Sequence, residues 1–196
     1  SVTGVQTCAL PISSDQVGGT VEQAGGTTEE MSAKGVFVVE CVGADGQVKW
    51  VDIAPNLVTN VGVQDMNNKY FTGSSYTAGW YVGLVNDKAA NSTFSYGDTL
   101  ASHTGWTENT QYTGNRKAAS FGAATLNQIS NINNSASAAS FTMNATATIG
   151  GAFLANVATG TSGTLFSVSA FQSPGDRSVV SGDVLNVTYS FNLTAS

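Results

Sequence analysis

The segment from Val184 to Thr194 alternates strictly between large apolar side chains and small polar ones. Successive side chains of a β-strand point to opposite faces of the sheet, so a period of two predicts a strand with one buried face and one wet face. That division is typical of antiparallel sheets and constrains the fold more than any other feature of the chain. The apolar set is Leu185, Val187, Tyr189, Phe191 and Leu193.

A β-hairpin is predicted near the start of the ordered region. Residues 34–43 (KGVFVVECVG) are dense in β-branched and aromatic side chains, and an alternating pattern resumes over residues 47–54 (QVKWVDIA). The pair Asp45-Gly46 lies between these segments and favours a type I′ turn. We therefore expect two adjacent antiparallel strands joined at Asp45-Gly46.

One short helix is expected next. Residues 56–71 place Leu57, Val61, Met66 and either Tyr70 or Phe71 at near-helical spacing. Thr59 or Asn60 can serve as the N-cap. This predicts a helix near residues 59–71.

The remainder of the chain reads as short strands separated by polar, small-residue loops. Together with the hairpin they predict a mainly β fold, an antiparallel β-sandwich that is Ig-like or jelly-roll-like. The predicted strands are residues 79–84, 107–112, 118–126, 139–149, 151–157, 163–171 and 184–194.

The first residues are interpreted separately from the fold. Val2 to Ile12 reads VTGVQTCALPI, which resembles the translation of a common sequencing-library adapter, so residues 1–13 are interpreted as an artefact. Residues 14–33 are poor in large apolar side chains and predict a flexible acidic arm. Residues 34–196 then form a single β-sandwich domain, a length that suits one hydrophobic core.

The charge of the chain excludes two classes of partner. Charged residues make up 10% of the sequence and the net charge is −6, so neither nucleic acid nor an anionic membrane surface is an expected partner. No apolar run is long enough to cross a bilayer. With Cys8 in the adapter-like segment, Cys41 stands alone and is expected to be a small buried side chain of a strand.

Few residues suggest catalysis, so we expect no enzyme and no cofactor. His103 is the only histidine and is interpreted as an exposed loop residue, since no G-x-S-x-G nucleophile motif accompanies it. Asp98, Glu108 and Asp183 are the carboxylates that a glycosidase would use, although their spacing does not favour that role. No metal-binding pattern of Cys, His or acidic residues is present, and no metal site is predicted.

Two short segments resemble each other, Tyr96-Gly97-Asp98-Thr99-Leu100 and Ser181-Gly182-Asp183-Val184-Leu185. Each places a Gly-Asp pair directly before a strand-like segment. We interpret them as the same turn chemistry used twice, and not as an internal repeat.

Aromatic side chains give the only candidates for a binding site. Trp80, Trp106 and Tyr76 are the residues that would contact a glycan or a protein partner if they were exposed. They belong to a larger set that could line a carbohydrate platform: Trp50, Trp80, Trp106, Tyr70, Phe71, Tyr76 and Tyr81. Aromatic residues of small β-sandwiches more often belong to the core. Exposure of Trp106 beside a concave sheet would favour the glycan-binding interpretation.

The order of the segments from about Gly35 to Ala195 resembles a group of small structural proteins found among the virion genes of tailed phages. The resemblance is carried by the succession FVVECVGADGQVKW, NLVTNVGVQDMNNKYF, YTAGWYVGL, GDTLASHTGWTENTQYT, NRKAASFG, NNSASAASFTMNATATIGGAFL, GTLFSVSAF and DRSVVSGDVLNVTYSF.

This resemblance implies a location in the virion and a structural role, with phage capsid or tail proteins as partners and a homo-oligomeric state. The leading expectation is a capsid decoration or cement protein that acts through subunit contacts. Two alternatives stay open: a tail or fibre component that binds host-surface glycans, and a phage polysaccharide hydrolase.

Overall fold

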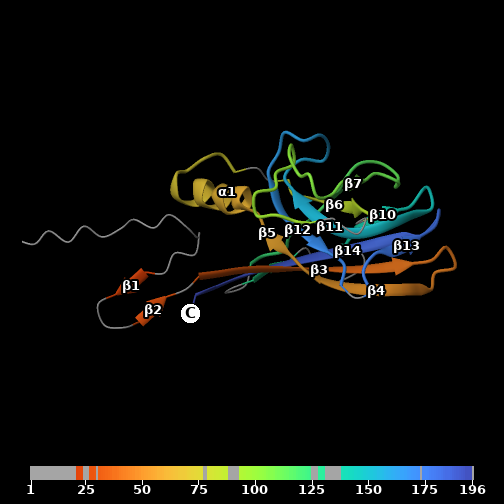
Figure 1. Ribbon diagram of the computed structural model, residues 1–196, viewed down its shortest axis with the longest axis horizontal. Helices are drawn as coiled ribbons and strands as arrows, with labels where there is room; N and C mark the ends of the chain where they lie inside the picture. Colours follow the sequence, from red (N-terminus) through yellow and green to blue (C-terminus); the bar gives the residue numbers. More distant parts are fainter. Residues whose placement is uncertain are drawn as a thin grey trace, which may run out of the picture.

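In the structure, a computed structural model, two antiparallel sheets face each other across a shared core (Figure 1). The structure describes residues 21–23, 27–29, 31–76, 79–87, 93–124, 128–130, 138–172 and 174–195. Within these residues the first sheet has the order β10-β14-β3-β4 and the second the order β5-β12-β11-β6-β7. The predicted antiparallel, mainly β sandwich with a short helix is confirmed.

The centre of the first sheet is a long ribbon of two strands. β3 and β14 pair along their whole length, from Val42 opposite Val184 to Met31 opposite Ala195. β4 pairs with the other edge of β3, while β10 and β9 pair with the other edge of β14. The bounds are β3 (Met31–Val42), β4 (Val48–Pro55), β9 (Gln128–Ser130), β10 (Ala139–Thr142) and β14 (Val184–Ala195).

The hairpin between β3 and β4 forms as predicted, but its turn lies one residue earlier. The backbone N–H of Gly46 donates to the carbonyl of Gly43 at 2.9 Å, which makes Ala44 and Asp45 the central pair. Gly46 follows the turn with φ +78°, an arrangement that joins strands through a three-residue loop. The type I′ turn centred on Asp45-Gly46 was therefore wrong.

The second sheet is buried on both faces. One face packs against the first sheet, and the other is covered by the segment that carries Phe94, Leu100 and Trp106. This explains why consecutive residues of β6, β11 and β12 are buried instead of alternating with exposed ones. The bounds are β5 (Leu57–Val58), β6 (Tyr81–Asn86), β7 (Glu108–Asn109), β8 (Lys117–Ala118), β11 (Ala147–Ala155), β12 (Leu165–Ala170) and β13 (Arg177–Val179).

Two predicted strands, 139–149 and 151–157, are divided at the wrong place. The interruption falls after Met143, and β11 then continues through Gly150 and Gly151, with a shift of its register to β6 between Ile149 and Gly151. A Cβ at Gly151 would overlap the backbone carbonyl of Ser169 on β12, so the glycine permits close strand pairing there and does not mark a loop.

Other predicted strands are shorter than expected. Of residues 107–112 only Glu108–Asn109 forms a strand, with Tyr112 in an isolated bridge to Met143. Of residues 118–126 the described part is strand only at Ala118. Each of these segments pairs with β6 over two residues only.

The helix α1 (Asn60–Phe71) begins as predicted, with Thr59 as its N-cap. The Thr59 hydroxyl accepts a hydrogen bond from the Gly62 backbone N–H at 3.1 Å and donates to the carbonyl of Leu165. Gly62 is buried against β12, so close that a Cβ at this position would meet the carbonyl oxygen of Phe166. The cap and the glycine together fix the helix on the second sheet.

The residues before the predicted domain boundary include strands. β1 (Val21–Gln23) pairs with β2 (Thr27–Glu29) in a separate two-stranded sheet, and β3 already begins at Met31. Part of the segment predicted as a flexible arm, residues 14–33, therefore belongs to strands. Residues 1–13 lie outside the described residues.

Candidate interaction surface

The outward face of β3 and β4 exposes a strip of large apolar side chains, which we call the outer face. On β4, Val48 is 54% exposed, Val51 49% and Ile53 62%. On β3 the outward residues Val36 and Val38 are half-buried beside them. Contiguous exposed apolar side chains of this kind mark interaction sites in soluble proteins.

The ladder between the strands brings these side chains together. Val38 lies opposite Ile53, and Val36 lies opposite Pro55. Side chains directly opposite one another in an antiparallel pair have Cβ atoms about 5 Å apart, so the strip is continuous. Figure 1 shows β3 and β4 at the lower margin of the molecule, with the second sheet above them.

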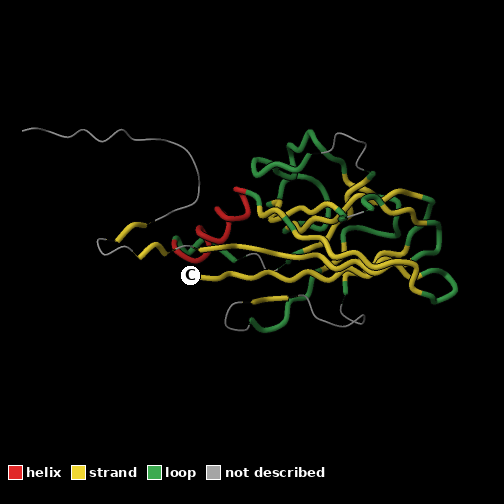
Figure 2. The backbone as a smooth tube through the Cα atoms, turned by 60° about the horizontal axis from the view of Figure 1, so that its bottom comes forward, coloured by secondary structure: helices red, strands yellow, loops and turns green. Residues whose placement is uncertain are grey.

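The outer face continues onto β14 with a different character. Asn186, Thr188 and Ser190 point outward there, opposite Glu40, Val38 and Val36 of β3. The surface therefore changes from apolar over β3 and β4 to small and polar over β14. Figure 2, in which this side of the molecule comes forward, shows β3 and β14 running side by side across it.

The strand β4 forms an edge of its sheet, since no other described strand pairs with its free side. It is held from the inside by the buried carboxylate of Asp52, which is 3% exposed. Asp52 accepts hydrogen bonds from the Arg177 guanidinium at 2.7 Å and 3.2 Å and from the Gln172 backbone N–H at 3.2 Å. An inward-pointing charge on an edge strand also disfavours uncontrolled strand addition.

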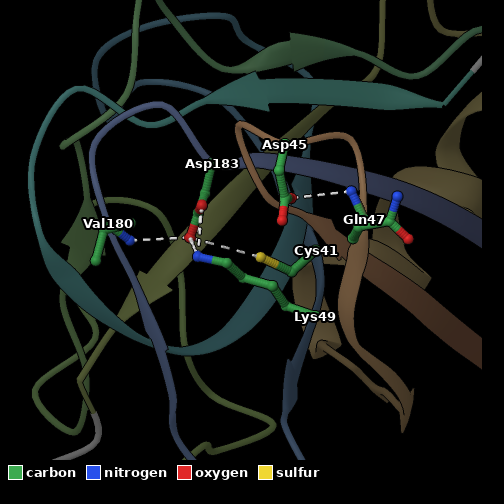
Figure 3. A network of polar contacts seen from close by, with 6 residues as sticks. All are labelled: Cys41, Asp45, Gln47, Lys49, Val180 and Asp183. Carbon is green, nitrogen blue, oxygen red and sulfur yellow. Dashed lines mark hydrogen bonds and ion pairs between the residues drawn. The ribbon is translucent and has the colours of Figure 1, made fainter.

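A second ion pair holds β4 near the hairpin (Figure 3). The Lys49 ammonium donates to both oxygens of the buried Asp183 carboxylate, at 2.7 Å and 2.9 Å. The backbone N–H of Val180 donates to the same carboxylate at 3.0 Å. Burial alone raises the pKa of Asp183, but these hydrogen bonds and the charge of Lys49 outweigh it and hold the pKa below its ordinary value.

Cys41 is buried beside this pair, as predicted, with its Sγ 3.9 Å from the Asp183 carboxylate. Burial and the neighbouring negative charge raise the pKa of the thiol to about 11. The thiolate is the reactive form of cysteine. Cys41 is therefore a packing residue, and the network around Asp183 is a structural clamp.

The two Gly-Asp turns share one hydrogen-bond pattern, which confirms their interpretation as turn chemistry. In each, the Asp backbone N–H donates to the carbonyl three residues earlier, and the Asp carboxylate accepts from the N–H of that earlier residue. The earlier residues are Ser95 for Asp98 and Val180 for Asp183. Each carboxylate also binds one distant side chain, Trp106 or Lys49.

Trp106, one of the predicted contact residues, belongs to the core. It is 4% exposed, and its indole Nε1 donates to Asp98 at 2.9 Å. Its ring packs on Phe153 of β11. The ring of His103 stacks on Trp106 with a centroid distance of 3.9 Å, so His103 is half-buried and the expectation of an exposed loop histidine was wrong.

The other two predicted contact residues lie near the end of α1. Trp80 is half-buried, packs on Phe166 and lies 5.6 Å from the Lys69 ammonium. Tyr76 is 72% exposed, with its ring 5.9 Å from the same ammonium. Two further aromatic residues at the helix end are exposed, Tyr70 (84%) and Phe71 (77%), and both belong to the aromatic set predicted to line a carbohydrate platform. We call Tyr70, Phe71, Tyr76 and Trp80 the helix-end aromatic group.

The three carboxylates considered for glycosidase chemistry are each bound to a different partner. Asp98 binds Trp106 and Asp183 binds Lys49, as described above. Glu108 forms a two-point ion pair with Arg116, with N–O distances of 2.8 Å and 2.7 Å. Among the described residues no three His, Cys, Asp or Glu side chains gather as a metal site would require.

A shallow depression of about 250 Å³ lies beside the Glu108–Arg116 pair. Its lining includes Tyr112, Thr159 and Gly160. Arg116 also donates to the carbonyl of Val157 at 3.1 Å, so its guanidinium is held by the protein itself. Glu108 and Arg116, the charged residues that line this depression, are therefore already paired within the protein.

Comparison with known proteins adds no family: no family model matches the sequence, and no curated protein matches it. Within the described residues, no helix has the length and apolarity that crossing a membrane requires. The outer face, with its exposed apolar side chains, is the strongest candidate for a functional surface among the described residues.

Proposed function

We propose that this chain is a structural protein of a bacteriophage virion and acts through contacts between subunits, in the first place as a capsid decoration or cement protein. The observation that supports the proposal is the exposed apolar strip formed by Val48, Val51 and Ile53 on the outer face. In this role the chain is not an enzyme, and its partners are phage capsid proteins and further copies of itself.

The arrangement of the sandwich supports a contact role for this face. Among the residues that the structure describes, the second sheet is covered on both sides, whereas the outer side of β4 in the first sheet is exposed. Valine and isoleucine side chains that stay in contact with water contribute little to the stability of the sheet. Burying them against a partner is favourable by about 25 cal/mol per Å² of apolar surface. On a particle, many weak contacts add through avidity.

The test is binding to phage particles. Purified protein is mixed with stripped heads and with isolated tails of a tailed phage that carries a related gene, and bound density is imaged by cryo-electron microscopy. We expect ordered density on heads, which Ile53→Asp abolishes and Ser162→Asp, on an exposed loop, leaves unchanged. Binding to neither heads nor tails contradicts the proposal.

A second candidate function rests on the helix-end aromatic group. Exposed aromatic rings can stack on sugar rings, and Lys69 beside Tyr76 and Trp80 adds a hydrogen-bond donor. This arrangement favours a tail or fibre component that binds host-surface glycans. Glycan-array binding that disappears in Tyr76→Ala and persists in Ile53→Asp supports this function over decoration, and an array without binding removes it.

A further inference from the structure

Two opposite charges border the apolar centre of the outer face on β3. Lys34, Val36, Val38 and Glu40 all point outward, since the intervening residues of β3 are buried. Among the described residues, neither Lys34 nor Glu40 has an ion-pair partner. At about 3.3 Å per residue the two charged positions lie roughly 20 Å apart, with the valines midway between them.

This order is complementary to itself when reversed. We propose that a second copy of this chain packs on the outer face. The two copies are related by a two-fold axis that lies in the interface between their first sheets, perpendicular to β3 and level with Phe37. Such an axis places β3 over β3 of the partner in the opposite direction. Lys34 then faces the Glu40 position of the second copy, and Val36 faces the Val38 position, each pair occurring twice.

The neighbouring strands match under the same operation. The register of each neighbouring strand to β3 decides which positions meet. On β4, Ile53 lies opposite Val38 and Pro55 opposite Val36. On β14, Thr188 lies opposite Val38 and Ser190 opposite Val36. On β4 the apolar match is between Ile53 and Pro55, because the positions that correspond to Val48 and Val51 fall beyond the end of β4. On β14 small hydroxyls meet hydroxyls. The matched positions are Ile53 with Pro55, Thr188 with Ser190, and Asn186 with Asn192.

The size of the face indicates a weak dimer. Three strands about 4.8 Å apart and roughly 30 Å long give a planar footprint of about 400–500 Å² per copy. Stable interfaces bury about 800 Å² per partner, and smaller ones belong to transient complexes. We therefore expect association at high protein concentration, or where copies are held close together on a particle.

The inference rests on the proposed function, because it names the partner of the contact face as a second copy of the chain. A different virion protein on the same face would need no relation between Lys34 and Glu40. The two-fold arrangement demands one, and this makes charge exchange a specific test.

The experiment measures self-association by sedimentation velocity over a wide range of concentration for the wild type, Lys34→Glu, Glu40→Lys and the double variant. Each single substitution creates two like-charge contacts in the dimer, so we expect association to weaken about tenfold or more. The double variant should associate like the wild type. Ser162→Lys on an exposed loop is the control for a change of charge and should leave association unchanged.

Mixing the two single variants is the decisive measurement. In a mixed pair both contacts join opposite charges, so Lys34→Glu and Glu40→Lys should associate with each other as strongly as the wild type does with itself, although each variant alone self-associates more weakly. A monomeric wild type, single variants that associate normally, or a mixture that stays monomeric overturns the inference. Thermal unfolding of every variant verifies that these outward substitutions leave the fold intact.

Head binding separates failure of this inference from failure of the proposed function. A monomeric wild type that binds heads, with binding lost in Ile53→Asp, means that another virion protein covers the face, so only the self-pairing is wrong. Charge-dependent dimers that bind neither heads nor tails leave the self-pairing intact and contradict the virion role.

Discussion

The ion pair beneath β4 determines how firmly the edge strand, and with it the outer face, is held. Asp52 is 3% exposed and its carboxylate accepts hydrogen bonds from Arg177 and from the backbone N–H of Gln172. Asp52→Asn keeps the shape and one acceptor oxygen but removes the charge. Hydrogen bonds to charged groups contribute about 1.5–3 kcal/mol, and the Arg177 side chain retains some contact with water. We expect the free energy of unfolding to fall by about 2 kcal/mol.

The matched control is Asp65→Asn on α1. Asp65 pairs with Lys69 one helical turn away at 2.9 Å, and such pairs contribute only about 0.3–0.5 kcal/mol. Urea denaturation gives both losses from the transition midpoints, provided the slopes agree. A loss of about 2 kcal/mol corresponds to a Tm lower by roughly 4–8 °C in a domain of this size. Equal losses in the two variants would refute the assignment of Asp52–Arg177 as the main clamp of the edge strand.

Three further predictions concern single positions. Gly151→Ala should destabilise the protein by about 3 kcal/mol or more, measured by urea denaturation, because its Cβ would overlap the Ser169 carbonyl; a loss below about 1 kcal/mol would contradict this. The folded-state pKa of Asp183 is depressed. The stabilisation that it contributes is therefore complete above its unfolded pKa of about 4 and is lost as pH falls through the folded value. The free energy of unfolding should fall more steeply with decreasing pH in the wild type than in Asp183→Asn, and equal slopes would contradict this. Peptide mapping after iodoacetamide treatment near pH 8 should leave Cys41 unmodified in the folded protein and modified in urea, given its pKa of about 11 and its burial; rapid labelling of folded protein would disprove the packing role.

Local pattern was enough to predict β14, the hairpin strands β3 and β4, and α1. For β14 and α1 the period of the apolar residues agrees with a turn or cap signal. For the hairpin, two β-rich segments flank the turn, which lies one residue earlier than expected. The break expected at Gly150-Gly151 failed because β11 is buried on both faces. Its pattern therefore has no period of two, and the glycine reflects contact with a strand that the sequence does not identify.

The contact surface was less accessible to sequence reasoning. β4 carries apolar residues on both faces, with Trp50 and Ala54 on one and Val51 and Ile53 on the other. The choice of inner face is settled by Asp52, whose partner Arg177 lies 125 residues away in the chain. Trp106 was a reasonable contact candidate by composition, but the buried acceptor Asp98 draws its indole inward.

The pairing of β3 with β14 has a consequence for how the chain assembles. During synthesis the β3–β4 hairpin emerges early, and the strand that completes its sheet emerges about 130 residues later. Throughout that interval the open edge of β3 can accept an equivalent strand from any neighbouring chain. Exchange of β14 between two nascent copies, a form of domain swapping, therefore competes with correct folding of each single chain.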